Sequence, residues 1–252
     1  MKSGGFGYGF SRNLLSNVGF EIGFTPPAAA FISRGLALHY DIGRASSYPG
    51  SGNTVTDIVG NSSATLTGSP SYSSGYLTFN GTSQYLITNT SLGSAVTTDI
   101  TSVMMWAYPM DNGVLLSERG EASLASGWHD SQMEMVGGSM KFGMWNGLGI
   151  SSVTSTVATP LNNWYHFAMV YDGTKLLTYV NGQSAGTVTF SRLNPIEGAA
   201  GLHYAIAGPD STSMGDGGYA NMRLGQFLVY SRALDPSDIE QLFRLGRRTY
   251  GV

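Results

Sequence analysis

The 252-residue chain contains no cysteine, and only 12% of its residues are charged. Disulfide bridges and thiolate metal sites are therefore excluded. The charged fraction is about half of the roughly 25% that is usual for a globular domain. The 13 basic residues are outnumbered by 16 acidic ones, which gives a net charge of −3. This balance argues against a nucleic-acid partner, because proteins that bind nucleic acids concentrate positive charge.

Long hydrophobic runs are also missing from the sequence. No apolar segment approaches the ~18 residues that a membrane-spanning helix needs. Near the N-terminus, one Lys precedes a glycine-rich run where a secretory signal would have an apolar segment. We therefore expect no membrane insertion and no secretory signal.

What the sequence has in abundance is glycine, with 35 residues, and hydrophobic residues, which make up 42%. The chain from Gly35 onward reads as short strands joined by turns, which favours a two-sheet antiparallel sandwich or jelly roll. The expected strands are residues 36–42, 76–80, 84–88, 100–108, 164–172, 175–181, 183–190 and 223–231. The segment 100–108 is apolar on both faces, as is typical of a strand in the middle of a sheet covered on both sides.

Three short connections are expected to form hairpins. Residues 81–83 separate two strands by a hairpin-length gap. Asp172-Gly173-Thr174 and Asn181-Gly182 each contain a dipeptide that tolerates the positive φ angles of hairpin turns. We therefore expect the strands on either side of each connection to pair.

One helix is expected, over residues 234–246 near the C-terminus. Asp235 is a suitable N-cap, and Pro236 suits the first helical position. Apolar residues then recur with helical spacing, and Gly246 is expected to end the helix.

Residues 1–34 differ from the rest of the chain and are interpreted as an extended arm. They contain the run GFGYGF, show no sustained periodicity, and are interrupted by Pro26-Pro27. A glycine-rich aromatic arm gains stability by ordering on a partner surface, where each buried aromatic contributes about 1.5–3 kcal/mol. The residues expected to bind the partner are Phe6, Tyr8, Phe10, Phe20 and Phe24.

Four blocks of sequence, within residues 35–246, resemble the laminin-G-like branch of the concanavalin A-like lectin/glucanase jelly rolls. They are residues 36–72, LTFNGTSQYLIT (77–88), NNWYHFAMVYDGTKLLTYVNGQSAG (162–186) and LVYSRALDPSDIEQLF (228–243). The opening GLALHYDIGRASSYPGSG is similar to the version found in bacteriophage structural proteins. The resemblance implies an all-β, two-sheet antiparallel jelly roll over residues 35–252. It does not fix a function, because this fold hosts lectins, hydrolases and virion parts.

The sequence departs from this family at acidic positions that in some relatives bind calcium. The family often has Asp-Gly-x-x-Asp-Tyr where this chain has residues 80–85, and an acidic pair where Gly225-Gln226 stand. Calcium prefers several oxygen ligands, carboxylates among them. Asp41, Asp57 and Asn61 remain as partial metal ligands, and the alternative interpretation is that Asp57 and Asn61 organise a turn. We expect no cofactor, with structural calcium as the open alternative.

Catalytic residues are not evident in the sequence, and we expect no enzymatic activity. Glycosidases need two carboxylates at a fixed separation. Here Glu134 stands alone, whereas Glu118 and Glu121 fall in an expected surface turn. The four histidines show no metal-ligand spacing, and His39 and His166 are expected to be packed and hydrogen-bonded within strands.

A glycan site would combine aromatic faces with polar loops. Trp106 and Trp164 fall in strong strands, which favours a packing role. The glycan-binding candidates lie near turns or beside the polar loop GPDSTSMGDGG, and they are Trp128, Trp145, Tyr204 and Tyr219.

The first functional hypothesis is a phage capsid decoration (cement) or head-fibre protein on the outer surface of the virion. Its arm would bind a major capsid or other scaffold protein, and it would form a symmetric oligomer such as a trimer. The alternative is a carbohydrate-binding adhesin or tail-fibre lectin that recognises glycans on host cells.

Overall fold

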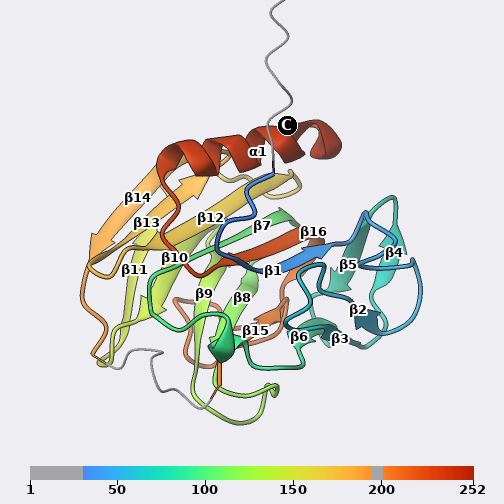
Figure 1. Ribbon diagram of the computed structural model, residues 1–252, viewed down its shortest axis with the longest axis horizontal. Coiled ribbons are helices and arrows are strands. Elements are labelled where there is room, and N and C mark those ends of the chain that lie inside the picture. The colour runs from blue at the N-terminus through green and yellow to red at the C-terminus, as the bar shows by residue number, and fades with distance from the viewer. Residues whose placement is uncertain (1–30, 194–200) are drawn as a thin grey trace, which may run out of the picture.

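The computed structural model describes residues 31–193 and 201–252, so residues 1–30 of the proposed arm, with Phe6, Tyr8, Phe10, Phe20 and Phe24, lie outside the described residues. The described chain forms two antiparallel sheets and one helix, as the sequence predicts (Figure 1). No helix in this part of the chain is long and apolar enough to cross a membrane.

The first sheet, sheet A, has eight strands in the order β14-β13-β12-β7-β16-β5-β4, with β1 also paired to β16. In chain order these are β1 (Leu36–Asp41), β4 (Ser71–Ser73), β5 (Tyr76–Asn80), β7 (Thr101–Pro109), β12 (Tyr165–Tyr171), β13 (Lys175–Val180), β14 (Gln183–Thr189) and β16 (Asn221–Tyr230). One edge of β16 is shared, because its first residues pair with β5 and its last residues pair with β1.

The second sheet, sheet B, also has eight strands, in the order β11-β10-β9-β8-β15-β6-β3-β2. In chain order these are β2 (Thr54–Val55), β3 (Ala64–Thr67), β6 (Tyr85–Thr88), β8 (Gly113–Arg119), β9 (His129–Val136), β10 (Ser139–Trp145), β11 (Ile150–Thr154) and β15 (His203–Ile206). A short 3-10 helix, η1 (Leu92–Ser94), follows β6.

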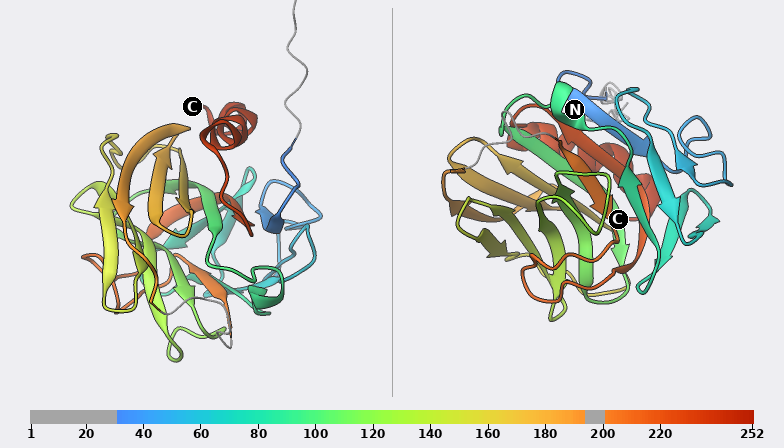
Figure 2. Two further views of the ribbon diagram at one scale, coloured as in Figure 1. Left: turned by 60° about the vertical axis from the view of Figure 1, so that its left-hand side comes forward. Right: turned by 90° about the horizontal axis from the view of Figure 1, so that it is seen from below.

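Strand β7 shows how the sandwich buries both faces of one strand. Val103 and Met105 point into the core between the sheets, whereas Met104 packs under the C-terminal helix. That helix, α1 (Pro236–Tyr250), lies across the outer face of sheet A, as Figure 2 shows from the side. The prediction that segment 100–108 is covered on both faces is therefore confirmed.

Two of the three expected hairpins are confirmed, and the third is wrong. β12 pairs with β13 across Asp172-Gly173-Thr174, and β13 pairs with β14 across Asn181-Gly182, where φ is +52° and +76°. The connection 81–83 instead carries the chain from β5 in sheet A to β6 in sheet B. Asn80 organises this connection, because its Oδ1 accepts hydrogen bonds from the backbone N–H groups of residues 82, 83 and 84.

The helix begins as predicted but ends later. The Asp235 carboxylate caps it by accepting hydrogen bonds from the N–H groups of Ser237 and Asp238. Gly246 does not end the helix, which continues to Tyr250 and is capped by Gly251. Gly246 instead lies against the indole of Trp106, where a Cβ atom would clash with the ring. The glycine thus permits a close helix–sheet approach.

Candidate functional site

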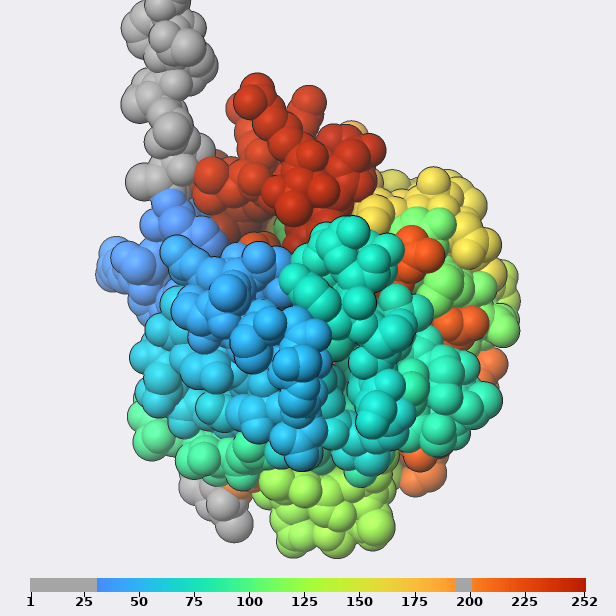
Figure 3. All heavy atoms as spheres, turned by 90° about the vertical axis from the view of Figure 1, so that its right-hand side faces the viewer, coloured from blue at the N-terminus to red at the C-terminus, as the bar shows by residue number. Residues whose placement is uncertain are grey.

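A hollow of about 600 Å³ opens at the edge of the sandwich, between the loop that precedes β2 and the turn that connects β3 to β4. Figure 3 shows the side of the molecule that carries these strands and loops. The walls of the hollow include Tyr48 and Tyr72, and its polar groups come from Ser51, Asn53 and Ser69. A concave site of this volume with a few polar groups is typical of small-ligand binding.

The two tyrosines of this hollow have different roles. Tyr48 is buried and donates a hydrogen bond from its hydroxyl to the Gly52 carbonyl at 3.0 Å, which fixes the loop. Burial raises the pKa of the Tyr48 phenol, so the hydroxyl remains a neutral donor. Tyr72 packs against Tyr48 edge to face, with ring centroids 5.4 Å apart, and 38% of its surface is exposed. Tyr72 therefore offers an accessible ring on a rigid support.

Gly50 allows the loop that precedes β2 to lie close to the Tyr72 ring. Gly50 has a φ of +92°, and a Cβ atom there would lie 3.2 Å from the Tyr72 ring. On the opposite wall, Gln84 Nε2 donates to the carbonyls of Gly68 and Ser69, at 2.8 and 3.1 Å. Both walls are thus held in place by hydrogen bonds that do not use the exposed hydroxyl groups of Ser51 and Ser69.

The glycan-binding residues expected from the sequence differ in their exposure and in their contacts. Trp128 is 39% exposed, Trp145 and Tyr219 are half-buried, and no ring contact joins these three in the described part of the chain. Tyr219 contacts Tyr85 instead, with ring centroids 6.5 Å apart. The placement of Tyr204 at the surface is wrong, because this side chain is fully buried against Phe227 in the core between the sheets.

The turn interpretation of Asp57 and Asn61 agrees with the structure. The buried Asp57 carboxylate accepts hydrogen bonds from the backbone N–H groups of His39, Val59, Asn61 and Ser62. The Asn61 amide donates to the Ala37 carbonyl at 2.8 Å. Asp41 lies in β1, and no group of three or more His, Cys, Asp or Glu side chains that could hold a metal ion occurs within residues 31–193 and 201–252.

A pair of carboxylates missed by the sequence analysis lies between the sheets. Glu118 in β8 and Asp130 in β9 are directly opposite each other in register, and both are almost completely buried. The sequence predicted that Glu118 lies in a solvated surface turn, and this prediction is wrong. Burial, and then the neighbouring Glu118, raise the pKa of the Asp130 carboxyl well above its usual range. At 0–1% exposure the two groups are closed to a sugar-sized substrate.

Arg192 balances this buried charge. Its guanidinium donates to Glu118 Oε2 at 3.0 Å, to Asp99 Oδ1 at 3.5 Å and to the Trp145 carbonyl at 3.1 Å. Burial lowers the pKa of Arg192, but the carboxylates, Glu118 first, outweigh burial and raise it. The sequence offered no signal for this group, because its members are far apart along the chain.

A second set of buried polar residues fixes the loop 207–218 on the outer face of sheet B. The Glu134 carboxylate accepts hydrogen bonds from the Ser131 hydroxyl and from the backbone N–H groups of Met214, Asp216 and Gly217. Asp210, within the loop, pairs with Arg119 at 3.3 Å and with His129 at 2.6 Å. Glu134 therefore organises a loop.

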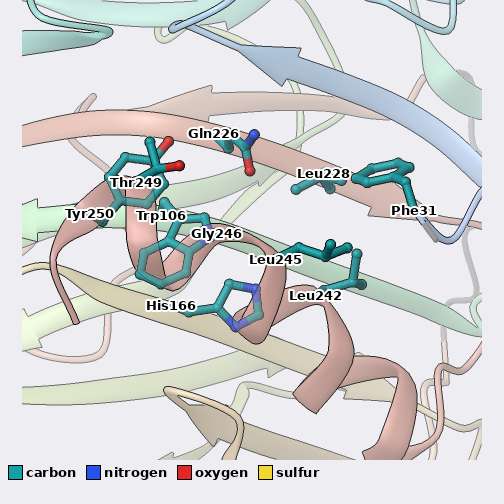
Figure 4. Close-up of a pocket in the computed structure, with 10 residues that line it drawn as sticks. All are labelled: Phe31, Trp106, His166, Gln226, Leu228, Leu242, Leu245, Gly246, Thr249 and Tyr250. Atoms are coloured by element: carbon teal, nitrogen blue, oxygen red, sulfur yellow. The ribbon is translucent and has the colours of Figure 1, made fainter. Parts of the chain in front are cut away.

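A small cavity of about 90 Å³ lies between helix α1 and sheet A (Figure 4). Trp106 and His166 line its floor with ring centroids 5.2 Å apart, and Leu242 and Gly246 of the helix line its roof. His166 is fully buried, its Nδ1 has no hydrogen-bond partner in the described chain, and burial lowers its pKa to about 3. The packing predicted for His39 and His166 is confirmed, since both are buried in strands, but His39 Nε2 and His166 Nδ1 lack the expected hydrogen bond in the described chain.

Comparison with solved structures shows the same fold in toxins and a sialidase. The binding domain of Paraclostridial Mosquitocidal Protein 1 matches 83% of this chain with a TM-score of 0.60 and 15% identity. Trypanosoma rangeli sialidase in complex with sialic acid matches 87% with a TM-score of 0.62 and 16% identity. The binding domain of Botulinum neurotoxin DC in complex with rat synaptotagmin II matches 83% with a TM-score of 0.57 and 13% identity.

The match covers only part of each of these proteins. The chain spans 52% and 51% of the two toxin binding domains and 34% of the sialidase. No curated protein matches the sequence. A family model, however, matches residues 80–240, which is more than half of the chain. The chain therefore belongs to the concanavalin A-like lectin/glucanases superfamily.

Proposed function

We propose that this jelly roll is a non-catalytic, lectin-like module that binds carbohydrate in the hollow beside Tyr72. The observation that carries the proposal is the exposed Tyr72 ring on one wall of a 600 Å³ hollow that Ser51, Asn53 and Ser69 also line. Sugar rings have apolar faces edged by hydroxyl groups. An aromatic face beside several short polar side chains therefore matches them.

Two further observations support binding without catalysis. Two of the structures reported above are binding domains by name. A glycosidase also needs two carboxylates that flank the scissile bond. In this chain Glu118 and Asp130 lie opposite each other but are sealed between the sheets, and Arg192 already engages Glu118.

The replacement Tyr72→Ala is expected to weaken glycan binding at least tenfold, because it removes the exposed stacking face while leaving the hydrogen bonds of Tyr48 and Gln84 in place. Trp128→Ala is the matched control, since Trp128 is an equally exposed aromatic outside the hollow. A glycan array would identify the ligand, and titration calorimetry would compare the two variants with the native protein. The proposal is wrong if the native protein binds no glycan, or if only Trp128→Ala weakens binding.

We propose further that the domain is displayed on the outer surface of a phage virion as a decoration or head-fibre protein. The support is the likeness of its opening segment, from Gly35, to phage structural proteins, together with the aromatic-rich segment that precedes it. In this role residues 1–34 bind a capsid or other scaffold protein, and the jelly roll faces outward, where it can reach glycans on a host cell.

Co-sedimentation with virions that lack this protein tests the display. We expect the full chain to pellet with the particles and a chain that starts at Gly35 to stay in the supernatant, because the aromatic side chains of the arm make the contact. Equal pelleting of both chains would assign the contact to the jelly roll, and failure of both would remove the virion role.

A further inference from the structure

A row of aromatic side chains lies on the outer face of sheet A. Trp164 contacts Tyr76 and Tyr108, each with ring centroids 5.7 Å apart, and it contacts Tyr250 at the end of α1 at 4.6 Å. These four residues, the aromatic row, are all half-buried, so part of each residue reaches solvent. They come from β5, β7, the residue before β12, and the helix, and they form one continuous surface.

Arg223 of β16 lies within the aromatic row. Its register partner on β7 is Tyr108, and its guanidinium carbon is 4.6 Å from the centre of the Tyr108 ring and 5.0 Å from that of Tyr76. Within residues 31–193 and 201–252 Arg223 makes no ion pair, and its buried Nε has no hydrogen-bond partner. By contrast, the almost completely buried side chains of Arg119 and Arg192 both pair with carboxylates.

An arginine in this setting is ready to bind an anion. A cation–π contact attracts the guanidinium, but the rings accept none of its N–H groups in the way a carboxylate does. Guanidinium and carboxylate geometries match, and the pair forms two parallel charge-assisted hydrogen bonds. Since no partner for Arg223 occurs within residues 31–193 and 201–252, a carboxylate of a bound ligand can supply it.

The aromatic row restricts the chemical class of ligand that can present this carboxylate to Arg223. The rings around Arg223 make the surroundings of the charge largely apolar, so the ligand needs an apolar C–H surface close to its acid group. A pyranose ring with a carboxylate, as in uronic and sialic acids, has both. We propose that Arg223 and the aromatic row form a second binding site, selective for acidic sugars and separate from the hollow beside Tyr72.

The test compares acidic and neutral probes on the full chain. The acidic probes are 3′-sialyllactose and tetragalacturonate, and the neutral controls are lactose and the carboxyl-reduced tetramer. We expect the native protein to bind at least one acidic probe at least tenfold more tightly than its neutral control. Added salt should weaken this binding, because screening reduces the attraction of exposed charges.

Two variants locate the binding. Arg223→Met keeps a long apolar side chain without the charge, and it should weaken binding of the acidic probe at least tenfold. Arg223→Lys should retain part of the affinity, because it keeps the charge but loses the paired geometry of the guanidinium. Tyr76→Leu, at the start of β5, is a second variant that leaves Arg223 in place and should also weaken binding. Thermal melting of each variant checks folding.

The two variants Tyr72→Ala and Arg223→Met distinguish a wrong proposal for the Arg223 site from a wrong proposal for the hollow beside Tyr72. Tyr72→Ala should leave acidic-sugar binding unchanged, and Arg223→Met should leave binding in the hollow unchanged. The second site is disproved if the native protein does not distinguish acidic from neutral probes. It is also disproved if folded Arg223→Met binds the acidic probe as tightly as the native protein.

Discussion

Replacing Arg192 with methionine is expected to lower the free energy of unfolding by about 3–5 kcal/mol. Its guanidinium is the partner of Glu118 between the sheets, and only 4% of the Arg192 side chain and 1% of the Glu118 side chain are exposed. Methionine fills a similar volume but leaves the carboxylate without its cation. A buried charge without a partner is far more costly than the intact pair is stabilising. Urea unfolding followed by tryptophan fluorescence would measure the loss.

Arg244→Met is the control for Arg192→Met, and Glu118→Gln is the change expected to restore stability. Arg244→Met removes an arginine that pairs with Glu240 on the surface of α1, where the side chain is 65% exposed. This change should cost less than about 1 kcal/mol. Adding Glu118→Gln to Arg192→Met should recover part of the lost stability, because it removes the orphaned charge. If the single and double variants are equally unstable, Arg192 acts through packing, and its role as a counter-ion is wrong.

Acid should destabilise the protein through His166 over a defined pH range. Burial lowers the pKa of His166 to about 3, against 6.5 for an ordinary histidine. Between these values the unfolded state binds a proton that the folded state does not. The contribution of His166 to stability is therefore fully present above pH 6.5, and it falls by about 1.4 kcal/mol per pH unit as the pH drops toward 3.

The replacement His166→Phe isolates this effect from the titration of carboxylates. The phenylalanine ring can keep the contact with Trp106 but cannot take up a proton. Urea unfolding at pH 7, 6, 5 and 4 should show the variant gaining stability relative to the native protein at each step below 6.5. Curves that stay parallel across this range would show that His166 does not titrate in this way. His39, whose pKa is also lowered chiefly by burial, is unchanged in the comparison.

Local patterns in the sequence predicted much of the fold. The alternation of apolar residues with glycine-containing turns predicted two antiparallel sheets, and Asn181-Gly182 predicted its hairpin because both residues tolerate positive φ. Asp235 and Pro236 predicted the start of the helix. Each of these features depends on residues within a few positions of one another, so the sequence carries the full physical reason.

Where the local pattern failed, a distant segment decided the outcome. Gly246 looked like a helix end, but Trp106 lies against it and Tyr250 stacks on the same indole, so the helix continues across the sheet. Tyr204 stands beside a polar loop in the sequence, yet β15 places its ring in the core. In both cases the deciding contact joins residues that are more than 20 positions apart.

The candidate binding sites show most clearly which features local sequence determines and which depend on contacts between distant segments. The sequence by itself determined the family, the sandwich and the shortage of charge. Only the tertiary structure placed Tyr72 beside Tyr48 at the rim of a hollow and placed Arg223 among aromatic rings, with no counter-ion in the described part of the chain. The reason is physical: a site depends on which strands lie next to each other, and residues far apart along the chain, such as Arg223 of β16 and Tyr108 of β7, become neighbours only when the sheet forms.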